Sequence, residues 1–166
     1  ALAKVEWEDW AAAVRVAVRS LRERVPAGAP LVLVGYSNGG ALSVNYAAEA
    51  LESDSLPRPD GLVLYSPMIG ITPMAAFTEL FPAASAISGE PKLAWSAVQP
   101  EIDPFKYSSW PINASLQGYR MTMRVEEQLA ALAAAGRMGE FPPVLAVQSA
   151  VDSTVLVTRL IEGLMD

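Results

Sequence analysis

The sequence of 166 residues contains no cysteine and no histidine. Without cysteine there is no disulfide framework and no thiolate ligand for a metal. Without histidine there is no imidazole ligand, and also no imidazole to act as a base near neutral pH. We therefore expect no metal and no cofactor. Any acid-base chemistry within these residues has to use other side chains.

Long apolar runs and basic clusters are also absent. No apolar stretch is long enough to cross a bilayer, and nothing at the start of the chain resembles a signal peptide. The 12 basic residues are scattered and outnumbered by 18 acidic ones, which gives a net charge of −6. Because nucleic-acid binders carry a basic patch or stripe, we expect no nucleic-acid partner. The hydrophobic content of 52% indicates one globular domain with a sizeable core.

Helical and strand patterns alternate along most of the chain. We predict an amphipathic helix, a strand covered on both faces, a second helix, a second strand, and a last strand followed by a helix from Thr154 onward. In the same order, the first five elements span residues 5–25, Leu31–Val34, about 38–51, Leu62–Tyr65 and Pro143–Val151. A strand, helix and strand joined by crossovers of this length predict parallel pairing.

The segment 67–142 differs from the rest because it is rich in proline and aromatic residues. Its aromatics include Phe77, Phe81, Trp95, Phe105, Tyr107, Trp110 and Tyr119. One clear helix is predicted at about 114–135, with Asn113 capping its start and Gly136 its end. A linker would not carry so much apolar surface, so we interpret residues 67–142 as a cap inserted between two core segments, 1–66 and 143–166.

A nucleophile-elbow motif lies between the first predicted strand and the following helix. It has the form G-x-S-x-G and reads Gly35-Tyr36-Ser37-Asn38-Gly39. A sharp turn would expose the Ser37 hydroxyl, the glycines would relieve crowding, and the Asn38 N–H could face a developing oxyanion. The alternative is a helix-capping serine or a phosphate cradle. The lysine of a P-loop and the G-x-G-x-x-G of a Rossmann turn are both absent.

Three segments carry a family resemblance: LVLVGYSNGGALSVNYA, GLVLYSPMIG and PPVLAVQSAVDSTV. Together they resemble the α/β-hydrolase superfamily, in particular its capped esterases and its monoacylglycerol-lipase-like and serine-aminopeptidase-like enzymes. The resemblance implies a partial α/β-hydrolase fold, in which a parallel sheet is flanked by helices. It also implies a serine hydrolase in which Ser37 is the nucleophile, Asn38 the oxyanion-hole donor and Asp152 the triad acid.

Asp152 has an alternative role as a helix N-cap, because Ser153 and Thr154 follow it at the start of the last predicted helix. The other aspartates considered for the triad are Asp60, in a predicted turn before Gly61, Asp54, in a polar loop, and Asp103, which precedes Pro104. The position of Asp152 after the final strand favours it as the acid.

A serine and an aspartate need a base, and the sequence provides no histidine. In the family the histidine follows the next strand, so we expect it outside these residues, in a longer chain of which 1–166 is an inactive fragment. The alternatives are a non-catalytic binder of small molecules with an α/β-hydrolase-like fold, or an enzyme in which another base replaces the histidine. We expect an ester or related acyl compound as ligand, and a second copy or a complementary fragment at the exposed edge of the Leu31–Val34 strand.

Overall fold

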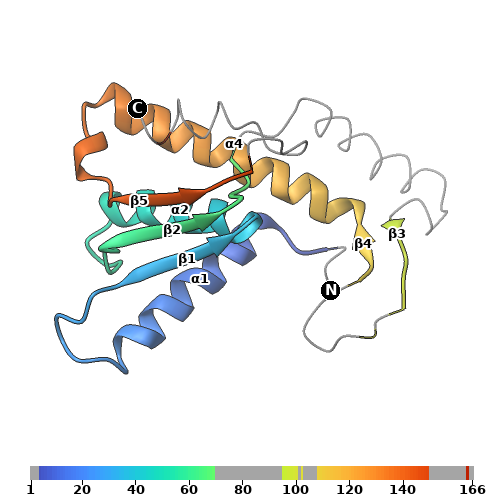
Figure 1. Ribbon diagram of the computed structural model, residues 1–166, viewed down its shortest axis with the longest axis horizontal. Helices are drawn as coiled ribbons and strands as arrows, with labels where there is room; N and C mark the ends of the chain where they lie inside the picture. The colour runs from blue at the N-terminus through green and yellow to red at the C-terminus, as the bar shows by residue number, and fades with distance from the viewer. Residues whose placement is uncertain (1–3, 70–94, 101, 103–107, 150–163, 165–166) are drawn as a thin grey trace.

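The computed structural model describes residues 4–69, 95–100, 102, 108–149 and 164. Its main feature is a three-stranded parallel sheet with the strand order β1-β2-β5 (Figure 1). The strands are β1 (Val32–Tyr36), β2 (Gly61–Tyr65) and β5 (Val144–Val147). The predicted parallel pairing is therefore confirmed, although β5 is shorter than expected. The predicted helix from Thr154 onward lies outside the described residues.

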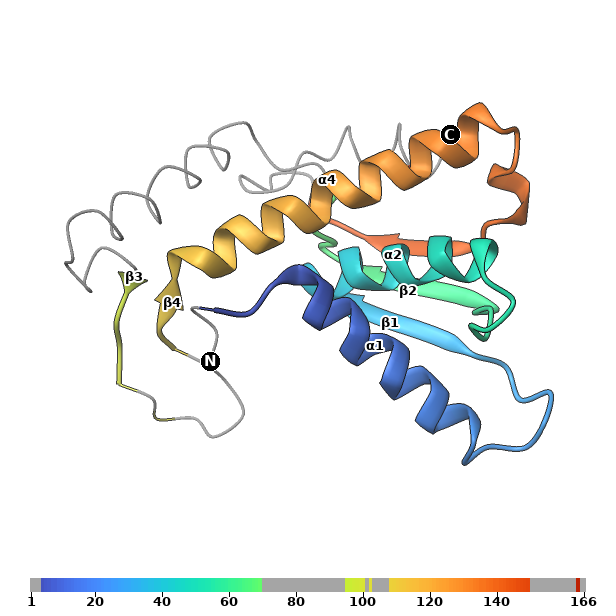
Figure 2. The same ribbon diagram turned by 180° about the vertical axis from the view of Figure 1, so that it is seen from behind.

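Three long helices lie on one side of this sheet (Figure 2). They are α1 (Trp7–Arg22), α2 (Asn38–Glu52) and α4 (Ile112–Ala134), and a short 3-10 helix, η3 (Met138–Glu140), leads into β5. Helix α2 contacts β1 and both other helices. This layer of helices on a parallel sheet is a partial α/β-hydrolase fold, as the sequence predicted.

The core lies between the sheet and the helices. Because side chains alternate along a strand, every second residue of β2 faces the helical layer. Leu62 and Leu64 are the two that do so, and they are 2% and 0% exposed. They pack in one cluster with apolar residues of α2 and α4, including Ala41, Val44 and Val125. This cluster fixes α2, and with it the turn that precedes the helix, against the strands.

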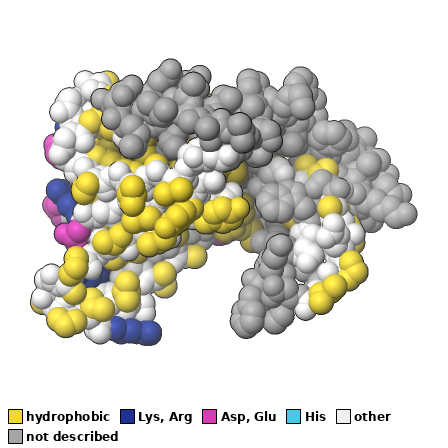
Figure 3. Space-filling model, viewed as in Figure 1, with side chains coloured by type: hydrophobic (Ala, Val, Ile, Leu, Met, Phe, Trp, Pro, Cys, Tyr) yellow, Lys and Arg dark blue, Asp and Glu magenta, His cyan; other side chains and the backbone are white. Residues whose placement is uncertain are grey.

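The other face of the sheet corrects one prediction. Covering on both faces was expected for the first strand, but Val32, Val34 and Tyr36 of β1 are 51%, 67% and 73% exposed. The register aligns these residues with the same face of β2 and β5, where Tyr65, Leu145 and Val147 are also exposed. Apolar side chains consequently gather over the strands on this face (Figure 3).

Helix α4 confirms one prediction at its end and corrects another at its start. Gly136 has a φ of +66° and follows the last turn, where the N–H groups of Gly136 and Arg137 bond to the carbonyls of Ala133 and Leu132. This double bond pattern is a Schellman motif. At the start, however, the N-cap is Pro111, not Asn113.

The predicted cap also contains a second small sheet that its sequence did not reveal. β3 (Trp95–Ala97) pairs antiparallel with β4 (Trp110–Pro111). Of the aromatics noted in the sequence, Phe77, Phe81, Phe105 and Tyr107 lie outside the described residues. No helix in the described part of the chain has the length and apolar character needed to cross a membrane.

Candidate active site

Ser37 occupies the junction between β1, which ends at Tyr36, and α2, which begins at Asn38. Its backbone has a φ of 52° and a ψ of −120°. A residue with a side chain seldom adopts such a conformation, because it costs on the order of 1–3 kcal/mol. Residues strained in this way are found most often at active sites. The Ser37 side chain makes no capping hydrogen bond to the helix, and its backbone is not in the extended conformation usual for an N-cap. The geometry therefore favours an elbow over a capping serine.

Two glycines allow this turn to close. A Cβ at Gly35 would lie 2.5 Å from the carbonyl oxygen of Gly39, and a Cβ at Gly40 would lie 2.6 Å from the Cβ of Pro67. A Cβ at Gly39 would meet nothing within 4 Å. The crowding predicted for Gly35 is present, whereas the crowding predicted for Gly39 is found one residue later, at Gly40.

The backbone of Ser37 is hydrogen-bonded on both sides. Its N–H donates to the carbonyl of Tyr65 at 3.0 Å, and its own carbonyl accepts from Met68 at 2.9 Å and from Gly40 at 2.9 Å. A strained backbone persists only where its surroundings determine it strongly. The end of β2 and the residues after it supply that support here.

Asn38 is the first residue of α2, so its N–H is one of the amides that have no partner within a helix. No backbone acceptor for this N–H is recorded among the described residues. The helix dipole adds a partial positive charge at the same point. The side-chain Oδ1 of Asn38 is buried and unpaired in the described part of the structure. An N–H in this position is suited to stabilise negative charge beside the Ser37 hydroxyl.

The predicted acid, Asp152, lies outside the described residues, as does Asp103. The strands are parallel, and Tyr36, Tyr65 and Val147 are paired in one row across the sheet. The chain therefore leaves β5 at the carboxyl ends of the strands, where Ser37 also lies. Asp54, after the end of α2, and Asp60, before the start of β2, lie instead toward the amino ends of the strands. Asp60 binds Leu31 there, with its Oδ2 accepting the Leu31 N–H at 2.7 Å, and this bond gives Asp60 a structural role.

A cavity of about 630 Å³ lies away from this elbow, between α1, α4 and the end of α2. It is lined mainly by charged and polar side chains, among them Arg15, Arg19, Glu49 and Gln128, and it includes neither Ser37 nor Asn38. Within the described ranges, no group of three or more acidic, histidine or cysteine side chains is placed to hold a metal ion.

Comparison with known proteins agrees with this geometry. The family described as "Serine aminopeptidase, S33" matches residues 4–156. No curated protein matches the sequence. Among solved structures, a monoacylglycerol lipase from Paleococcus ferrophilus is similar with a TM-score of 0.50 and 14% identity, over 91% of this chain and 67% of that one. At this identity the structural likeness concerns the fold alone. Since the family match spans most of the sequence, the chain belongs to the serine aminopeptidase S33 family of the α/β-hydrolase superfamily and is a hydrolase of that type.

Proposed function

We propose that this protein is a serine hydrolase that cleaves a carboxylic ester or a related acyl bond. The observation that carries the proposal is the backbone of Ser37, which combines a positive φ with a position between a parallel strand and a helix. This arrangement is the structural context in which a G-x-S-x-G serine acts as a nucleophile. Family membership supports hydrolysis in general, and the elbow supports Ser37 as the residue that performs it.

In the proposed mechanism, the Ser37 Oγ attacks the carbonyl carbon while its proton passes to a histidine outside these residues. The Asn38 N–H stabilises the oxyanion. The protonated histidine then gives its proton to the leaving alcohol as the acyl bond breaks. Water attacks the acyl-enzyme in a second cycle of the same proton transfers, which releases the acid and restores Ser37. Asp152 orients the histidine and stabilises its charged form.

We propose residues 67–142 as a cap that favours uncharged, apolar acyl groups. This segment carries eight of the chain's aromatic residues and, in its described part, contains α4 and the β3-β4 pair. The similar solved structure is described as a monoacylglycerol lipase, which supports an acyl ester as the substrate class.

A fluorophosphonate probe tests the nucleophile, because it reacts with activated serines. We expect the full-length protein to be labelled and Ser37→Ala to abolish labelling. Ser53→Ala, which changes a serine just beyond the other end of α2, is the matched control and should be labelled normally. Labelling that survives in Ser37→Ala would remove Ser37 from the mechanism. A folded full-length protein that is not labelled and binds small esters without turnover would favour the non-catalytic binder.

Asp152→Asn separates the two proposed roles of this aspartate. If Asp152 is the triad acid, its replacement by asparagine should lower turnover by about 10⁴-fold while the fold is retained. As a helix cap only, its replacement should cost at most about 1 kcal/mol of stability and leave turnover of a p-nitrophenyl ester unchanged. Thermal denaturation and ester hydrolysis on the same samples distinguish these outcomes.

We also propose that β1 pairs through its free edge with a second copy or a complementary fragment. Among the described strands β1 contacts β2 only, and it combines an unpaired edge with exposed apolar side chains. Such an edge tends to add another strand. Val34→Lys, which places a charge on this exposed strand, should convert an associated species to a monomer in sedimentation. A wild-type chain that is already monomeric would contradict the pairing.

A further inference from the structure

The chain that follows β2 crosses directly over the elbow. We call residues Ser66–Ile69 the strap. Ser66 begins it with a φ of 41° and donates its N–H to the Val147 carbonyl at 2.8 Å. Pro67 is buried and fills the space beside Gly40, and the Met68 N–H donates to the Ser37 carbonyl at 2.9 Å. The strap therefore supports the strained turn by both packing and hydrogen bonding.

The far side of the strap is bound to helix α4. The Thr122 Oγ1 lies 3.0 Å from the Met68 carbonyl and 3.1 Å from the Gly118 carbonyl, so the single hydroxyl proton has these two acceptors. Thr122 is 1% exposed. A Cβ at Gly118 would lie 2.8 Å from the Met68 Cε, so the missing side chain lets α4 approach the strap closely. The backbone of Met68 is consequently held on both sides, by Ser37 through the Met68 N–H and by Thr122 through the Met68 carbonyl.

We propose that Thr122 is a positioning residue for Ser37 and acts through the backbone of Met68. This inference rests on the proposed function of Ser37, which it extends to a helix within the proposed cap. Thr122 is buried, whereas its hydrogen bond to the Met68 carbonyl is part-buried, so loss of the hydroxyl would remove one donor from that carbonyl. The strap would then hold the Ser37 carbonyl less firmly. A movement of α4 would likewise displace Ser37 through the contacts from Thr122 to Met68 and from Met68 to Ser37.

The test compares Thr122→Val, which keeps the shape and removes the hydroxyl, with Thr122→Ser, which keeps the hydroxyl. In the full-length protein, Thr122→Val should lower the rate of fluorophosphonate labelling at Ser37 by about tenfold, the equivalent of one buried hydrogen bond, and Thr122→Ser should restore the rate to within about twofold. Amide hydrogen exchange at Met68 should accelerate by about tenfold in Thr122→Val only.

Leu132→Val is the matched control, because Leu132 is a buried residue of α4 that packs in a separate cluster with Ala48 and Leu51. It should lower thermal stability while leaving the labelling rate and the Met68 exchange rate unchanged. The inference is overturned if Thr122→Val changes neither rate, or if Leu132→Val changes both to the same extent. If the wild-type protein is not labelled at all, the proposed function fails, and Met68 exchange still decides whether Thr122 holds the strap.

Discussion

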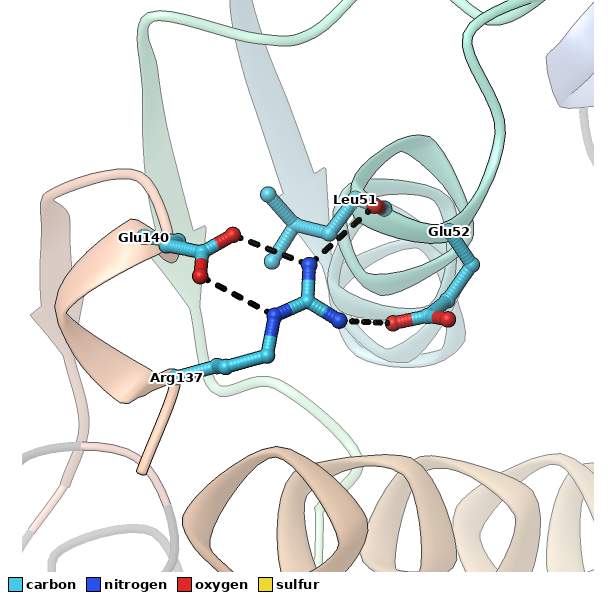
Figure 4. A network of polar contacts seen from close by, with 4 residues as sticks. All are labelled: Leu51, Glu52, Arg137 and Glu140. Atoms are coloured by element: carbon cyan, nitrogen blue, oxygen red, sulfur yellow. Dashed lines mark hydrogen bonds and ion pairs between the residues drawn. The ribbon is translucent and has the colours of Figure 1, made fainter. Parts of the chain in front are cut away.

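The two ends of the sheet are held by different kinds of interaction. At the carboxyl ends of the strands, Ser37 and Ser66 have positive φ values, and hydrogen bonds between backbone groups hold them in place. At the amino ends, charged side chains provide many of the contacts. Arg137 donates to Glu52, to Glu140 and to the Leu51 carbonyl, and so ties the end of α2 to the chain that enters β5 (Figure 4).

This difference predicts which substitutions should affect Ser37 and which should affect stability alone. A Cβ added at Gly35 or Gly40 would lie closer than van der Waals distance to its neighbours, so substitution of either glycine should change both folding and labelling. Half-exposed ion pairs contribute little to stability, because solvent screens them and the free side chains are flexible. Substitutions at the amino ends should therefore change stability modestly and leave Ser37 unaffected. The following variants test that separation.

Gly40→Ala should have the largest effect. The added Cβ would meet the Cβ and Cα of Pro67 at 2.6 and 2.8 Å, which forces the strap away from the elbow. We expect a loss of about 3 kcal/mol in the free energy of unfolding and a large drop in fluorophosphonate labelling. Gly39→Ala is the control, since its Cβ would have no neighbour within 4 Å and should change stability by at most about 0.5 kcal/mol. Equal effects of the two substitutions would refute the assignment of the crowding to Gly40.

Tyr46→Phe tests a buried contact toward the amino ends. The Tyr46 hydroxyl donates to the Pro57 carbonyl at 2.9 Å, and the residue is 1% exposed. Burial raises the pKa of this phenol, against an opposing effect of Arg19, so the donor stays neutral. Loss of the bond should cost about 1 kcal/mol in urea unfolding, and labelling at Ser37 should be unchanged. Tyr36→Phe, at a residue 73% exposed, should leave urea stability unaltered.

Arg137→Met removes the charged network and keeps much of the apolar stem. Because the Arg137 side chain is 33% exposed, we expect only a small decrease in melting temperature, of no more than a few degrees. The difference between wild type and variant should narrow in high salt, where ion pairs are screened. A change in the labelling rate of Ser37 would contradict the separation between the two ends.

Glu140→Gln should give the smallest effect, visible through its pH dependence. The hydrogen bond from Arg137, with a smaller contribution from its charge, holds the pKa of the Glu140 carboxyl below its ordinary value of 4.5. A lowered pKa in the folded state stabilises the protein above the ordinary value, and that contribution is lost as the pH falls through the folded pKa. Wild type should therefore be slightly more stable than the variant at pH 7, and the two should converge below about pH 4.5. A stability difference between wild type and Glu140→Gln that stays the same at every pH would contradict this ion pair.

The sequence was sufficient to predict the parallel core and the sharp turn at Ser37 between a strand and a helix, because both depend on local patterns. The aliphatic run of β1 followed by Gly35-Tyr36-Ser37 is one such pattern, and Gly136 beyond α4 is another. The nucleophile role of Ser37, the oxyanion role of Asn38 and the acid role of Asp152 remain predictions.

The features that the sequence did not reveal depend on contacts between distant residues. Gly40 is required by Pro67, which lies 27 positions later, and Met68 meets Thr122 54 positions away. The second glycine of the Gly39-Gly40 pair was visible, but nothing nearby indicated which of the two was crowded. Asn113 looked like a helix cap by its type, yet its side chain instead donates to the Val5 carbonyl, 108 positions earlier.

One face of the sheet is left exposed by the described helices, and the order of the strands explains why. From β1 to β2 and from β2 to β5, each step moves to the next strand on the same side. Crossovers between parallel strands are right-handed, so two steps in one direction place their helices on the same face. The helices α2 and α4 therefore share a layer, as Figure 2 shows. The exposure of Val34 and Leu145 thus follows from the strand order, which places the described crossover helices on the opposite face.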